Sequence, residues 1–229
     1  MADSGSDSSS DSETDASVHA NVTVTNDAKC EINKQAPLAN LTTSDYHIIW
    51  NPTGWLTSDI VHQAQVLLHE KNQSIEGFQC PTLGPVRNFD VVSGEFIQVL
   101  HTDSAHSVCV SNIGCPPFDV NVYDSLYQDV ICQEVADQTN DLLAGCHAPV
   151  QEQKQNGNDF GIFAIAFACH LGNGKDPWQV TSDPSRMHSH LAKCLRNGRW
   201  AISQYFSSNM DKPSAILVYL RMQEFKGTN

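Results

Sequence analysis

Apolar side chains recur at helical spacing along several segments of the chain. Residues 55–70 gather their apolar positions on one helical face, and Thr57 or Ser58 is suited to cap the N-terminus of that helix. Phe160–Leu171 is apolar at nearly every position, which predicts a central helix buried on all sides and ended by the glycines of 172–174. Helical patterns also occupy two further segments, 129–143 and 184–197.

Runs of β-branched and aromatic residues predict strands in the middle of the chain. The three clearest segments are 96–101, 106–113 and 118–124. The connections between them are short, so we expect antiparallel neighbours. Shorter extended segments are predicted at 146–152 and at Ala215–Leu220. Because the strands are grouped between helices, the pattern favours an α+β fold.

The N-terminal region differs from the rest of the chain in composition. Residues 1–28 hold six acidic side chains and no Lys or Arg, and the segment has almost no large apolar residues. Such a segment buries too little surface to offset its ordering entropy, so we expect residues 1–40 to be a disordered acidic tail. Four serines are each followed by an acidic residue three positions later: Ser4, Ser8, Ser10 and Ser12. The tail is therefore either a substrate for an acidophilic kinase or a solubilising segment.

Charge and cysteine usage exclude several classes of protein. The net charge of −13 disfavours nucleic acid as a partner, and no apolar run approaches the ~18 residues of a transmembrane helix. The first residues carry neither a basic nor an apolar region of a secretory signal. Eight cysteines occur without a CxxC pair, so we expect reduced thiols in an intracellular protein, nuclear or cytoplasmic and not secreted.

One pair of residues suggests acid–base chemistry. His106 opens one predicted strand and Asp124 closes the next, so antiparallel pairing brings both to the same edge of the sheet. A carboxylate there can orient an imidazole through one ring nitrogen, as a general base requires. The helix that begins at Phe160 would supply the positive end of its dipole to a nucleophile at that position.

Four short motifs occur in a specific order: Trp55-Leu56, His106, Val122-Tyr123-Asp124-Ser125, and Asn156 to Ala164. In this order and spacing the chain resembles the ubiquitin-like-protein-specific (SUMO) cysteine protease family, in its diverged, transposon-associated branch. The resemblance spans residues 50–197 and implies a papain-like, adenain-like fold with a central, mostly antiparallel sheet flanked by helices. It divides the chain into the tail of 1–40, a protease-like domain of 41–205 and a C-terminal extension of 206–229.

The resemblance also implies roles for individual residues. His106 matches the general base of the family, Asp124 matches the carboxylate that orients it, and Asp159 and Gly161 match the frame of the nucleophile. The nucleophile position itself holds Phe160, whose side chain has no heteroatom and cannot attack a carbonyl. Two cysteines near this frame are poor substitutes: Cys169 lies ~13 Å further along the helix, and Cys109 has the opposite strand parity from His106.

The substrate-binding positions of the family are only partly kept. Trp55 matches one of two tryptophans that line the tunnel for a Gly-Gly tail, whereas Ser107 stands where the family has the other. By the resemblance, the oxyanion-hole Gln of the family falls at Lys154, which Gln153 and Gln155 flank, and a shift of one residue would place a glutamine there, with Gln155 as the candidate donor. Without the resemblance, Trp55 is most simply a hydrophobic cap on its helix.

No cofactor or metal ion is expected from the sequence. His188 and His190 face opposite sides of their predicted helix, so together with Cys194 they make a poor metal site. The adjacent pairs Cys146-His147 and Cys169-His170 cannot share one tetrahedral ion.

Three functions remain open at the level of sequence. The first is a ubiquitin-like protease domain that has lost peptidase activity and binds a protein partner, such as the C-terminal tail of a ubiquitin-like modifier. The second is an active cysteine-type peptidase of the same family that uses another nucleophile. The third is a decayed domain from a mobile element with no selected role.

Overall fold

The computed structural model describes residues 41–51, 53–102, 106–117, 119–125, 131–144, 150–154, 160–180 and 182–201. The predicted acidic tail, the C-terminal extension of 206–229 and the predicted strand Ala215–Leu220 lie outside these residues, as do Gln155 and Asp159. The domain boundaries proposed above therefore stay predictions.

Two helices open the described chain. The first, α1 (Thr43–Trp50), begins at a capping box in which Thr42 and Asp45 bond to each other's backbone. The second, α2 (Ser58–Lys71), is capped by the Thr57 side chain, as expected, and buries its apolar stripe from Ile60 to Leu68. The predicted helix of 55–70 thus starts three residues later, and Trp55 and Leu56 lie in the loop that precedes it.

A five-stranded sheet forms the centre of the molecule, with its strands in chain order. The strands are β1 (Glu76–Gly77), β2 (Phe96–His101), β3 (Ser107–Ser111), β4 (Val120–Asp124) and β5 (Val150–Lys154). The middle pairings β2–β3 and β3–β4 are antiparallel, as the short connections predict. Both outer pairings, β1–β2 and β4–β5, are parallel, so the sheet is mixed.

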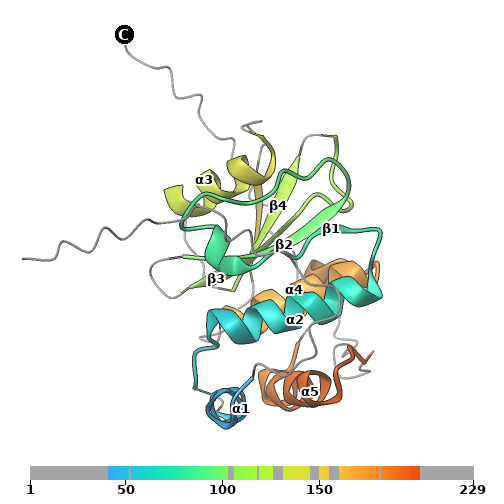
Figure 1. The fold of residues 1–229 in the computed structure, drawn as a ribbon. Helices are drawn as coiled ribbons and strands as arrows, with labels where there is room; N and C mark the ends of the chain where they lie inside the picture. The colour runs from blue at the N-terminus through green and yellow to red at the C-terminus, as the bar shows by residue number, and fades with distance from the viewer. Residues whose placement is uncertain are drawn as a thin grey trace, which may run out of the picture. The chain divides into compact units, whose positions relative to one another are not determined.

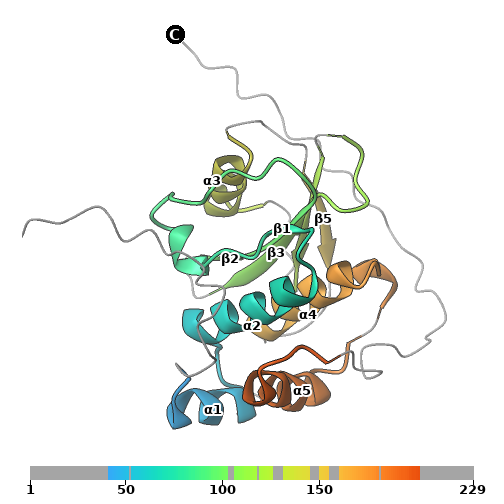
Figure 2. The same cartoon turned by 45° about the vertical axis from the view of Figure 1, so that its right-hand side comes forward.

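Helices cover both faces of this sheet (Figures 1 and 2). On one face lies α3 (Gln133–Leu142), over a cluster that includes Phe96, Leu100 and Val122. On the other face lie α2 and α4 (Phe160–Gly172), with α1 and α5 (Pro184–Asn197) packed beyond them. Short 3-10 turns occupy two connections, Pro81–Leu83 and Pro177–Gln179.

The central helix α4 is buried as its composition predicts. Every residue from Gly161 to Leu171 is buried, because the helix is sandwiched between the sheet and α5. This arrangement of helices on both faces of a mixed sheet confirms the α+β fold class. Within the described residues, none of the helices is both long and apolar enough to cross a membrane.

Candidate functional site

His106 and Asp124 meet at one end of the sheet. His106 directly precedes β3, Asp124 is the last residue of β4, and the antiparallel register of these strands brings the two together. His106 Nε2 lies 2.7 Å from Asp124 Oδ1, a charge-assisted hydrogen bond. The residues are 6% and 8% exposed, so the pair is held within the protein. The arrangement is that of an imidazole oriented by a carboxylate.

The second ring nitrogen of His106 faces no polar group in the described residues. His106 Nδ1 is buried and has no hydrogen-bond partner there. Phe160 packs against the imidazole instead, edge to face, with the ring centroids 4.4 Å apart and the planes at 77°. The atom that would take a proton from a nucleophile is thus buried, and an apolar ring at the start of α4 packs against its imidazole.

Gly161, the next residue, lets α4 approach the loop before α2. A Cβ atom at this position would lie 3.0 Å from Leu56 Cβ, closer than normal packing allows. Trp55, the neighbour of Leu56, is 61% exposed. The structure therefore places an exposed tryptophan in the loop before α2, directly before Leu56, which packs close to Gly161.

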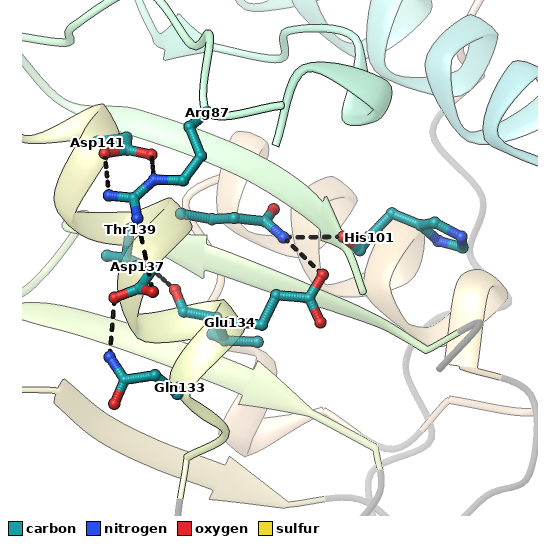
Figure 3. Close-up of polar contacts among 9 residues, drawn as sticks. Arg87, His101, Gln133, Glu134, Asp137, Thr139 and Asp141 are labelled. Atoms are coloured by element: carbon teal, nitrogen blue, oxygen red, sulfur yellow. Dashed lines mark hydrogen bonds and ion pairs between the residues drawn. The ribbon is translucent and has the colours of Figure 1, made fainter. Parts of the chain in front are cut away.

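Ser107 is buried, and its side chain takes part in hydrogen bonding at this end of the sheet. Its Oγ lies 3.2 Å from Nδ1 of His101, its partner across β2 and β3. His101 is tied in turn to the α3 layer, because Gln138 Nε2 donates to His101 O at 3.0 Å (Figure 3). A separate contact also holds α3, because Arg87 forms a two-pronged ion pair with Asp141 (Figure 3).

Two residues of this region, His101 and Gln138, were not identified from the sequence, whereas Leu56 and Ser125 belong to motifs named above. His101, Gln138 and Leu56 support the site from β2, α3 and the loop before α2. The hydroxyl of Ser125, next to Asp124, is buried without a hydrogen-bond partner in the described residues. The pairing of His101 with Ser107 follows from strand register, which was the only available signal.

The two thiols considered above as substitutes lie in the core. Cys109 and Cys169 are 0% and 3% exposed, and all six cysteines in the described ranges are free. Burial raises the pKa of the Cys109 thiol strongly, and it raises that of Cys169 to about 11. Both groups are therefore protonated thiols in a close-packed interior.

The histidines of α5 serve packing. His188 Nδ1 lies 2.7 Å from Ile49 O, which joins α5 to α1, while His190 Nε2 lies 3.4 Å from Cys194 Sγ. In the part of the chain that the structure describes, no group of three or more His, Cys, Asp or Glu side chains is arranged to hold a metal ion.

Known proteins resemble this chain in fold rather than in sequence. No protein-family model matches it, and no curated protein matches its sequence. A structure of the SUMO protease Ulp1 with its catalytic cysteine oxidised to a sulfonic acid matches 71% of this chain and 88% of its own, with a TM-score of 0.53 and 11% identity. The C-terminal Ulp1 protease domain in complex with Smt3, the yeast ortholog of SUMO, matches 69% of this chain and 83% of its own, with a TM-score of 0.50 and 12% identity. The chain therefore has the fold of the Ulp1 SUMO protease domain.

Proposed function

We propose that this chain is a domain of the ubiquitin-like protease family that has lost peptidase activity and binds a ubiquitin-like modifier, or a protein with a similar C-terminal tail, without cleaving it. The observation that carries the proposal is the contact between Phe160 and His106. His106 and Asp124 keep the geometry of a base and its orienting carboxylate. The position that faces them holds a phenyl ring, which has no nucleophilic atom.

Two of the other thiols, those of Cys109 and Cys169, support the loss of covalent catalysis. An attacking cysteine must be a thiolate within hydrogen-bond reach of its base. Cys109 and Cys169 are buried, and burial favours their protonated forms.

A binding role is supported by what the region keeps. Trp55 is exposed, as a contact residue must be, and aromatic side chains of this kind often supply much of the energy of an interface. The Ulp1 protease domain, which shares the fold, was solved in complex with Smt3. We accordingly place the domain inside the cell, in the nucleus or cytoplasm, where such a modifier is available.

The test uses the full chain and a SUMO protein that ends in Gly-Gly. Calorimetry should detect binding, and deletion of the two terminal glycines should weaken it, because the tail is the expected ligand. Trp55→Ala should weaken binding by about tenfold or more. Val86→Ala serves as a control, because Val86 is similarly exposed, at 68%, but lies in the loop between β1 and β2.

Hydrolysis is measured in parallel with a modifier–fluorophore substrate. No turnover at high protein concentration is expected. Turnover that a single Cys→Ala change abolishes would show an active peptidase with another nucleophile. Absence of binding to both forms of the modifier would overturn the binding role and leave the decayed-domain hypothesis.

A further inference from the structure

A concave region lies at the opposite end of the sheet from His106. It is a groove of about 650 Å³, formed by the loop before β2, the turn between β3 and β4, and the end of α3. Residues that line it include Gly94, Glu95, Pro116, Pro117, Asp119 and Leu143. Because Ile97 pairs with Ser111 and His101 pairs with Ser107, the strand register places the groove ~17 Å or more from the His106 end.

Side-chain and backbone hydrogen bonds fix the walls of this groove. Asn112 Oδ1 accepts from Phe96 N at 2.8 Å, and Asn112 Nδ2 donates to Gly94 O at 3.0 Å, which ties the β3–β4 turn to the loop before β2. Val92 N donates to Leu142 O at 2.9 Å and joins the same loop to α3. The groove is thus pre-formed, which lowers the entropic cost of binding.

The groove is acidic and partly apolar. Glu95 and Asp119 line it, and neither carboxylate makes a hydrogen bond or ion pair with a described residue. The carboxylate of Glu76 lies beneath the loop, where it accepts from Ser93 N at 2.7 Å. This bond holds the pKa of Glu76 below its usual range, so the side chain is ionised.

No positive charge offsets these acids at the groove itself. The described residues that line it include no Lys, Arg or His. Pro116, Pro117 and Leu143 form rigid apolar walls beside the carboxylates. A ligand that fits this surface needs a cation for the acids and a hydrocarbon surface for the walls.

We propose that this groove is a docking site for an extended segment of a partner protein in which arginine alternates with apolar residues. Two guanidinium groups of the segment pair with Glu95 and Asp119, while an alkyl stem and the neighbouring apolar side chain lie against Pro116, Pro117 and Leu143. The site is independent of the His106 region and of the function proposed for that region.

The test uses the ¹⁵N-labelled full chain and a capped seven-residue peptide that alternates leucine with arginine. NMR titration at low salt should shift the amide signals of Gly94, Glu95 and Gly114, with little change at Leu56 and Gly161. A peptide with glutamate in place of arginine should not bind. The double variant Glu95→Gln with Asp119→Asn should weaken binding by about tenfold, since two ion pairs are lost.

A second double variant, Asp59→Asn with Glu70→Gln, makes the same change in net charge on the exposed side of α2 and serves as the matched control. It should bind the peptide as the wild type does. Equal weakening by both double variants, or shifts spread over α2 and the His106 region, would show general attraction to an acidic surface and overturn the proposal. Absence of binding, or binding of the glutamate peptide, would also overturn it.

Discussion

The two ends of α4 each place a buried histidine beside a polar side chain, but the surroundings differ. At the N-terminal end, His106 bonds to the Asp124 carboxylate and packs against Phe160. In the last turn, His170 is 3% exposed and its Nε2 lies 3.4 Å from Ser182 Oγ. Burial, helped by Lys175, lowers the pKa of His170 to about 4, so it is neutral at physiological pH.

The difference shows which features mark a site. Burial and a hydrogen bond are common to both histidines, so neither feature identifies function. His106 bonds to a carboxylate that can stabilise a protonated imidazole, and it packs against the first residue of a helix, whereas the contact printed for His170 among the described residues is with the Ser182 hydroxyl. The site assignment therefore rests on Asp124 and on the position of Phe160, and each prediction below tests that contrast.

Truncation of a phenylalanine in α4 should have the largest effect on the free energy of unfolding. The cost should differ between Phe167, in the core, and Phe160, beside His106. Phe167→Ala should cost about 3–5 kcal/mol of unfolding free energy, because the side chain is 3% exposed and packs against Tyr123 and Phe163. Phe160→Ala should cost about 1–2 kcal/mol, because the residue is only partly buried at the end of the helix. Urea denaturation measures both values. Equal costs would mean that Phe160 is an ordinary core residue.

The second prediction concerns pH and His170. Its pKa is about 4 in the folded protein and near 6.5 when unfolded, so the unfolded chain binds a proton first as pH falls. The contribution of His170 to the free energy of unfolding is fully present above pH 6.5. It is lost progressively as the pH falls to about 4, and the loss from this residue reaches about 3 kcal/mol.

His170→Asn should flatten this pH dependence, measured as unfolding free energy at a series of pH values. Part of the slope should remain, because burial also lowers the pKa of His62 and His190. An unchanged slope in the variant would show that His170 is not the buried neutral group described here.

A third, smaller effect is expected from Asp124→Asn. The substitution keeps the shape of the side chain but removes the charge that faces His106 Nε2. It should cost about 1–3 kcal/mol, and the ¹⁵N signals of the His106 ring should show a changed tautomer balance. The exposed Asp90→Asn should change stability by less than about 0.5 kcal/mol. Identical ring signals in Asp124→Asn and the wild type would contradict the orienting role of Asp124.

Much of the fold follows from local sequence patterns. The predicted strand 96–101 and the helices at 160–171 and 184–197 match β2, α4 and α5 to within one residue, because their apolar patterns are strong and their ends carry turn residues. The α1 helix was missed because only Ile49 in it is buried, although the capping box at Thr42 marked its start. The parallel pairing of β5 with β4 depends on the crossover through α3, which no local pattern encodes.

The site was only partly predictable for a similar reason. The approach of His106 to Asp124 follows from the ends of neighbouring strands, so it could be expected from the strand pattern alone. The packing of Gly161 on Leu56 and the bond from Gln138 to His101 join segments that are far apart in the chain. Contacts of this kind depend on how the layers pack, which composition and spacing do not determine.

The most direct test of the central claim is the reaction of the wild type and of Phe160→Cys with a SUMO C-terminal vinyl sulfone, followed by intact mass and mapping of the modified residue. The wild type should remain unmodified, because the position that faces His106 has no nucleophile. Phe160→Cys should form an adduct at residue 160, and adding His106→Ala should slow that reaction by about 100-fold. An adduct at any cysteine of the wild type, or an inert thiol in Phe160→Cys, would contradict the account.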